Sequence, residues 1–155
     1  MTANTGRTTQ KWTTFLVDDS GGTLREIPVD SINGVGLTYD EVELTAFIDA
    51  VKGVLPAHPD CTITITGPFD TTASTGSHTV LSAIAGGTTP LALDVRIGVR
   101  HTWEAGEPTF GITGTTTAGF LCTEYVADVN AGKYSAKFRV FPGSTAPVWA
   151  TAAHT

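Results

Sequence analysis

The feature that most constrains this chain is the alternation of apolar and polar residues in several short segments. In residues 61–66, CTITIT, the cysteine and both isoleucines fall on one face and the three threonines on the other. Residues 91–100, LALDVRIGVR, and 133–141, KYSAKFRVF, alternate in the same way. Side chains repeat at every second residue in an extended chain, so the pattern predicts β-strands with one buried face.

Turn signals separate these segments from further candidate strands. Residues 12–18 and 24–29 flank the cluster DDSGG at 18–22 and predict a hairpin, and Asn33-Gly34 is a strong turn signal. We expect two more strands at 110–117 and 119–129. The composition agrees, because the 28 threonines and 17 glycines are poor helix formers and threonine favours strands.

One longer segment has a different period. In residues 43–55, ELTAFIDAVKGVL, the apolar residues recur at helical spacing, which predicts an α-helix. The helix could begin after Thr45 or at a capping box starting at Thr38, and Gly53 and Pro56 would end it. A second, short helix is a weaker candidate at 77–85. The apolar positions of the first helix are Leu44, Phe47, Ile48, Val51 and Leu55.

Together these elements predict a mainly β fold: an antiparallel β-sandwich or barrel with one flanking α-helix. The length of 155 residues favours one domain. We expect a flexible N-terminal arm at 1–11, the β domain at 12–143 and a C-terminal tail at 144–155. The first eleven residues lack the apolar core of a signal peptide and no apolar run is long enough to cross a membrane, so we expect a soluble protein.

The sequence shows no arrangement typical of catalysis or metal binding. It has no nucleotide-binding loop and no nucleophile elbow. The histidines, His58, His78, His101 and His154, have no ligand spacing. Cys61 and Cys122 lie in predicted strands, which favours two reduced, buried thiols over a disulfide. We therefore expect no enzyme, no catalytic residue, no cofactor and no bound metal.

Several polar or aromatic groups have a structural interpretation instead. The cluster at 18–22 is expected to be a plain turn rather than a calcium loop, and Glu104 and Glu107 a solvated turn. Arg96, Arg100 and His101 are expected to be ion-pair partners. Trp12, Trp103 and Trp149 are expected to anchor the core or an interface, with a carbohydrate platform as the alternative.

The surface composition predicts self-association. Charged residues make up 15% of the chain, below the usual figure of about 25%. Sheet edges rich in threonine and glycine are poorly protected against pairing with another chain, so copies of the chain are expected to cover one another. The net charge of −6 argues against a protein that grips nucleic-acid phosphates.

The order of the elements resembles that of bacteriophage tail tube proteins of the siphophage type, also called major tail proteins. The motifs are Thr45-Ala46 at the start of the predicted helix, Gly67-Pro68-Phe69-Asp70 after a strand, and the loop Gly106-Glu107-Pro108. Two departures from the family are expected: no long hairpin insertion between the early strands, and no added immunoglobulin-like domain. The segments that carry the resemblance are 15–29, 41–55, 62–72, 91–114 and 120–143.

The resemblance implies a structural subunit that forms hexameric rings, which stack into a tube for viral DNA. It implies a location in the virion after assembly in the bacterial host cytoplasm, with tape-measure, tail terminator and baseplate proteins as further partners. DNA would pass without specific binding, and no membrane would be involved. Asp94 is a candidate for the bore, and 1–11, 29–39 and the tail after Pro142 are candidates for ring-to-ring contacts.

The alternative function is another structural part of the virion. A capsid decoration protein, a tail terminator or a head–tail connector would use a similar small β fold. Location along the particle and copy number would separate these possibilities from a tube subunit.

Overall fold

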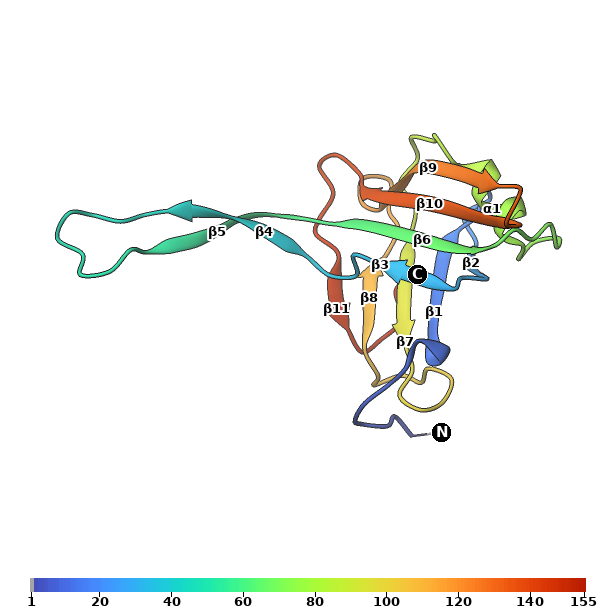
Figure 1. Ribbon diagram of the computed structural model, residues 1–155, viewed down its shortest axis with the longest axis horizontal. Coiled ribbons are helices and arrows are strands. Elements are labelled where there is room, and N and C mark those ends of the chain that lie inside the picture. The colour runs from blue at the N-terminus through green and yellow to red at the C-terminus, as the bar shows by residue number, and fades with distance from the viewer. Residues whose placement is uncertain (1) are drawn as a thin grey trace.

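The computed structural model describes residues 2–155, and strands make up most of its regular structure (Figure 1). The strands pair antiparallel with one another, and the described residues contain a single α-helix, which confirms the predicted mainly β fold class. The elements are η1 (Gln10–Trp12), β1 (Thr13–Asp18), β2 (Leu24–Ile27), β3 (Ser31–Asn33), β4 (Thr38–Glu43), β5 (Val54–Asp60), β6 (Thr62–Pro68), α1 (Ser77–Ile84), β7 (Leu93–Ile97), β8 (Thr109–Ile112), β9 (Phe120–Asp128), β10 (Lys133–Val140) and β11 (Val148–Ala150).

Two sheets pack face to face as a sandwich. The five-stranded sheet has the order β11-β8-β7-β1-β2, and the four-stranded sheet has the order β3-β6-β10-β9. Completely buried phenylalanines from both sheets fill the space between them, and Phe15 meets Phe138 with ring centroids 5.3 Å apart. The apolar faces of both sheets therefore form one continuous core.

The alternating segments behave as the sequence predicts. In β6 the residues Ile63 and Ile65 are completely buried, whereas the three threonines that alternate with them are half-buried. In β10, which pairs with β6, Tyr134, Ala136 and Phe138 are buried in the same way. The register between the two strands places apolar residues opposite apolar ones, so both strands turn one face to the core.

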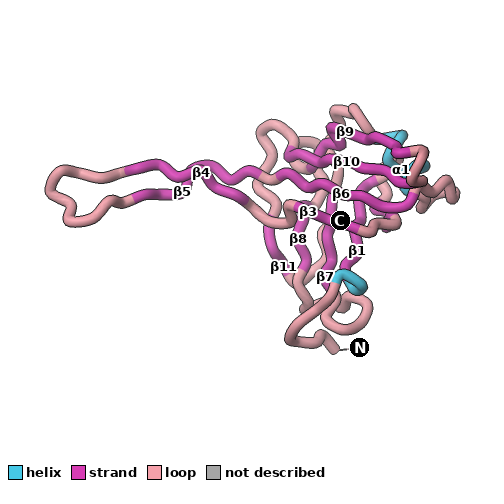
Figure 2. The backbone as a smooth tube through the Cα atoms, in the orientation of Figure 1, coloured by secondary structure: helices cyan, strands magenta, loops and turns pink. Residues whose placement is uncertain are grey.

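The predicted helix at 43–55 is wrong, because this segment forms the end of a long β-hairpin. β4 and β5 pair only with each other and form a separate two-stranded sheet. Figure 2 shows this hairpin extending far from the sandwich. The expected departure from tail tube proteins, the absence of a long hairpin insertion between the early strands, is therefore also wrong.

The strand that follows the hairpin in the chain explains why the hairpin forms. β5 runs into β6 with only Cys61 between them, so a central strand of the sandwich holds the base of the hairpin. At the tip, Thr45 Oγ1 accepts a hydrogen bond from the Gly53 amide at 3.0 Å, and Asp49 accepts one from the Ala46 amide at 2.8 Å. A short helix here would have no body to pack against, and unpacked short helices are marginal in water.

The flanking helix of the fold is α1, the weaker of the two predicted candidates. Its apolar residues Val80, Leu81 and Ile84 are buried in the sandwich core. Gly76 is its N-cap residue, and the buried Ser77 is the first helical residue. The Ser77 hydroxyl donates to the Pro68 carbonyl at 2.7 Å, which ties the start of the helix to the end of β6.

The two terminal segments both contact the sandwich. Asn4 and Thr8 in the N-terminal segment donate to the carbonyls of Val99 and Gly98. The C-terminal segment contributes β11, which pairs with β8 at the edge of the five-stranded sheet. Beyond β11 the chain continues with backbone bonds from Gly106 to Thr151 and from Gly114 to Thr155.

Candidate assembly surfaces

The β4–β5 hairpin presents the largest group of exposed apolar side chains in residues 2–155. Phe47 is fully exposed and Ile48 is 95% exposed, so neither side chain has a packing partner within the protomer. Burying one such side chain stabilises a protein by roughly 1.5–3 kcal/mol. The single protomer does not gain this stabilisation, because both side chains stay in contact with solvent. The exposed apolar residues of the hairpin are Tyr39, Val42, Leu44, Phe47, Ile48, Val51, Val54 and Leu55.

The hairpin also carries most of the net negative charge of the chain. Residues 38–60 contain five acidic residues and one lysine, which gives the hairpin a net charge of −4 out of −6 for the whole chain. One of these acids, Glu43, forms an ion pair with Lys52 at 3.0 Å. The hairpin is thus an apolar element bordered by carboxylates, a composition that suits burial in an apolar groove with a basic rim.

The outer face of the four-stranded sheet is polar and its charges are paired. The β6 threonines lie beside three cations of β10, and each cation has a carboxylate nearby. The ion pairs join Lys133 to Asp30 at 3.0 Å, Lys137 to Glu124 at 3.6 Å and Arg139 to Asp60 at 3.1 Å. This face therefore offers hydroxyl groups and neutralised cations rather than free positive charge.

Both sheets end in strands that have a neighbour on one side only. In the four-stranded sheet these strands are β3 and β9, and in the five-stranded sheet they are β11 and β2. β11 adds two half-exposed apolar side chains, Val148 and Trp149, and the Trp149 ring packs on Phe110 with centroids 5.0 Å apart. Such edges can pair with another chain unless something covers them.

Asp94 is a buried structural residue, so its assignment as a candidate for the bore is wrong. Its carboxylate is 0% exposed and accepts hydrogen bonds from Arg96 Nε at 2.8 Å and from the Thr109 hydroxyl. The C-terminal His154 adds its amide at 3.2 Å and its Nδ1 at 3.0 Å. The alternation of residues 91–100 places Asp94 on the outer face correctly, but the C-terminal segment covers that face.

Glu107 is also buried, which corrects the predicted solvated turn. Backbone amides of Asn4, Val99 and Glu104 donate to its carboxylate at 2.9–3.3 Å. His101 Nε2 lies 3.0 Å from Oε1, without the angle of a hydrogen bond. Burial raises the pKa of Glu107, but the amides and His101 lower it more, so it lies below its ordinary value of 4.5. Glu107 thus anchors the N-terminal segment to the loop that follows β7.

The ion pairs expected of the basic residues are present for two of the three. Arg96 pairs with Asp94 at 2.8 Å and His101 lies at ion-pair distance from Glu107. Arg100 instead donates to the Thr5 carbonyl at 2.7 Å. Arg100 has a φ of 67°, which lies in the left-handed region that few residues other than glycine adopt.

The acidic cluster after β1 is the predicted hairpin turn. Asp19 Oδ1 accepts from the Gly21 amide at 2.9 Å and from the Thr23 amide at 3.0 Å, while Oδ2 pairs with Arg25. The Thr23 amide bond is the largest of the effects that lower the pKa of Asp19, and the pKa lies below its ordinary value. With both oxygens engaged by the turn itself, the cluster is not arranged as a calcium loop.

No cluster of three or more histidine, cysteine, aspartate or glutamate side chains in residues 2–155 is placed to hold a metal ion. Cys61 and Cys122 are free and buried as predicted, and burial raises the pKa of each thiol to about 11. At neutral pH the thiols are protonated and poorly nucleophilic. No helix within that range is long and apolar enough to span a membrane.

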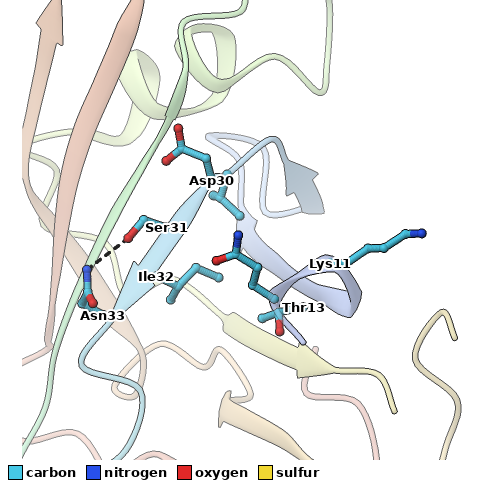
Figure 3. Close-up of a pocket in the computed structure, with 8 residues that line it drawn as sticks. Lys11, Thr13, Asp30, Ser31, Ile32 and Asn33 are labelled. Atoms are coloured by element: carbon cyan, nitrogen blue, oxygen red, sulfur yellow. Dashed lines mark hydrogen bonds between the residues drawn. The ribbon is translucent and has the colours of Figure 1, made fainter. Parts of the chain in front are cut away.

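A groove of about 480 Å³ lies between η1, β1 and β3 (Figure 3). Its charged side chains are Lys11 and Asp30, and Asp30 already pairs with Lys133. Ser31 and Asn33 bond to each other at 3.2 Å rather than pointing a reactive pair into the groove. The groove has the shape and the mixed apolar and polar lining of a docking surface. Its lining residues are Gln10, Lys11, Thr13, Val29, Asp30, Ser31, Ile32 and Asn33.

Comparison of the sequence with protein-family models finds no match, and comparison with curated proteins finds none. Several solved structures share the fold, and three of them are the following. A chain of the PVC sheath/tube terminator of an extracellular contractile injection system, in the extended state, has a TM-score of 0.60 and 13% identity over 96% of this chain and 99% of that one. A chain of the PVC sheath–tube complex has a TM-score of 0.62 and 12% identity over 94% and 93%.

The third structure is a chain of the anti-feeding prophage tube-terminating cap, with a TM-score of 0.59 and 13% identity over 98% of this chain and 96% of that one. Likeness at these identities shows the fold alone. It confirms the tail-tube-like architecture, and nothing in it points to a siphophage in particular.

Proposed function

We propose that this chain is a structural subunit of a phage-tail-like tube, and that copies of it assemble into rings that stack. The observation that carries the proposal is the projecting hairpin, whose apolar tip residues Phe47 and Ile48 have nothing to pack against within residues 2–155. The fold likeness to sheath–tube and terminator assemblies of contractile injection systems supports it. Those neighbours are structural proteins, which favours a role without catalysis.

The sheet edges support ring formation. β3 and β9 each lack a neighbour on one side, so pairing of β9 in one copy with β3 in the next would extend the four-stranded sheet around a ring. The resemblance to tail tube proteins implies six copies of the chain in each ring. Closure of this kind removes the unpaired edges that make the isolated protomer prone to association.

The outer face of the four-stranded sheet is the surface that we assign to the bore. Its three β10 cations are each neutralised by a carboxylate, so a polyanion would find little net attraction there. A conduit for DNA needs weak adhesion, because tight phosphate contacts would slow passage. On this proposal the particle assembles in the bacterial cytoplasm, and tape-measure and baseplate proteins remain candidate partners.

The second candidate function is a tube terminator. Two of the three compared structures are terminator or cap assemblies, and a terminator would use the same fold at one end of the tube. Copy number separates the two functions: a tube subunit forms many stacked rings, whereas a terminator forms one ring per particle.

The test is assembly of the purified chain with and without the apolar side chains of the hairpin tip. We expect the natural sequence to give rings or hollow tubes in negative-stain microscopy and multimers in sedimentation velocity. The variant Phe47→Ser with Ile48→Ser should fold and remain monomeric, because the tip loses the apolar surface that the partner buries. Val129→Ser is the matched control, since Val129 is an exposed apolar residue outside the hairpin.

Two results would contradict the proposal. One is a natural chain that stays monomeric at every concentration. The other is a tip variant that assembles as readily as the natural chain.

A further inference from the structure

The cations of this chain divide into two groups. Six of the nine lysines and arginines form ion pairs with carboxylates. The remaining three have no ion pair with any carboxylate of residues 2–155. They are Arg7, Lys11 and Arg100, and all three are exposed.

These three cations belong to one end of the molecule. Arg100 donates to the Thr5 carbonyl at 2.7 Å, which brings the loop after β7 against the N-terminal segment that carries Arg7. Lys11 lies 4.8 Å above the Trp12 ring, and the Gly98 amide donates to the Trp12 carbonyl at 3.0 Å. The N-terminal segment and this loop therefore build a basic end, which we define by Arg7, Lys11 and Arg100.

The basic end borders the groove of Figure 3. Lys11 is one of the residues that line it, and Val29 and Ile32 supply apolar surface. β3, which forms one wall, has a free edge because β6 is its only partner in the sheet. The groove thus combines a concave lining of mixed apolar and polar groups with an unpaired strand edge, and the basic end lies at its border.

The hairpin has the complementary character. Asp40, Glu41 and Asp49 are exposed and have no ion pair within residues 2–155, in contrast to Glu43 and Asp60. The same element exposes Phe47 and Ile48. Figure 1 shows the hairpin extending to one side of the sandwich, away from the N-terminal end, so the two surfaces do not meet within a protomer.

We propose that the hairpin of one copy docks into the groove beside the basic end of a second copy, with Asp40 and Glu41 facing Arg7 and Lys11. This inference rests on the proposed function and names the partner surface of its hairpin. The two surfaces differ, so the contact is head-to-tail and leaves a free hairpin and a free groove at its ends. Contacts of this kind produce closed rings or open filaments rather than isolated dimers.

Reversing the charges on each of the two surfaces tests whether the hairpin pairs with the basic end. The first variant carries Asp40→Lys and Glu41→Lys, and the second carries Arg7→Glu and Lys11→Glu. None of these four side chains takes part in a hydrogen bond within residues 2–155, so both variants should fold normally. In each variant alone, hairpin and groove have charges of the same sign, and we expect the concentration needed for assembly to rise roughly tenfold or more at low salt.

The equimolar mixture of the two variants gives the decisive result. Each hairpin then meets a groove of opposite charge on the other variant, so the mixture should assemble at nearly the concentration of the natural chain. Glu26→Lys is the control for a change of net charge, because Glu26 is an exposed acid on β2, outside both surfaces. Sedimentation velocity at low and high salt measures the two variants, their mixture, the control and the natural chain.

The outcomes separate this inference from the proposed function. If the natural chain assembles and either variant alone assembles equally well, or if the mixture shows no rescue, the charge pairing is wrong while the tube proposal stands. Docking of the hairpin on a different protein would also appear as a failure of the mixture to recover. If the natural chain never assembles, the proposed function itself fails.

Discussion

The sandwich and the hairpin use similar residues in opposite ways. In the sandwich Phe15, Phe110 and Phe138 are completely buried, whereas Phe47 at the hairpin tip is fully exposed. The sandwich also satisfies its buried carboxylates, while three carboxylates of the hairpin have no ion pair within residues 2–155. The sandwich therefore holds a complete core, and the hairpin has the composition of half of an interface.

The difference has an energetic consequence. A two-stranded hairpin on its own is marginally stable in water, so β4 and β5 depend on the continuity of β5 with β6 for their order. Association would give the hairpin the apolar burial that the sandwich already has. The exposed hairpin tip thus contributes little to the stability of the protomer itself.

The largest expected effect contrasts two phenylalanines. Phe138→Ala should lower the free energy of unfolding by about 3–5 kcal/mol, because it leaves a cavity against Phe15. Phe47→Ala should change the stability of the monomer by less than about 0.5 kcal/mol, because nothing packs on it. Urea denaturation of both variants at low protein concentration measures this contrast. Similar losses in the two would show that the tip packs on the sandwich.

Asp94→Leu should have the next largest effect. It leaves Arg96, Thr109 and His154 without their common acceptor, and we expect a loss of about 3 kcal/mol. The C-terminal residues should also become accessible to carboxypeptidase. Asp128→Asn, at an exposed turn, is the control. Unchanged protection of the C-terminus would show that His154 is held by other contacts.

Glu107 should make stability dependent on pH in the acid range. Its pKa is lowered on folding, so its contribution is complete above its ordinary value of 4.5 and is lost as the pH falls through the lower folded value. Glu107→Gln should flatten that part of the curve of stability against pH, measured by urea denaturation at several pH values. The same slope in both proteins would assign the acid dependence to other carboxylates.

Thr64→Lys should have the smallest effect on folding. Thr64 is half-exposed and lies opposite Lys137 in the β6–β10 register, so the added charge should cost less than about 1 kcal/mol. Because we assign this face to the bore, assembly should be unimpaired. A variant that folds but does not assemble would show instead that a partner chain covers the face and buries the new charge.

The sequence predicts the sandwich well because its signal is local. Alternation in β6 and β10 defines which side chains are buried, and the turn residues define where the strands end. The helical spacing at 43–55 was misleading for a related reason. That spacing identifies apolar residues that need a partner surface, but not whether the surface lies in the same chain, and the structure leaves these residues exposed.

The buried carboxylates could not be predicted in the same way. The burial of Asp94 depends on His154, which lies 60 residues further along the chain, and that of Glu107 depends on Asn4. Contacts between residues so far apart in the chain cannot be recognised from the sequence immediately around each acid. The candidate groove likewise forms from segments around Lys11 and Ile32 that approach each other only in the folded chain.

The most direct test of the account is hydrogen exchange of the natural full chain at increasing protein concentration. We predict that the amides of β4 and β5 gain protection as the concentration rises, while those of β7 and β10 remain protected throughout. Exchange in residues 38–60 that is the same at every concentration would contradict the claim that other copies complete the hairpin.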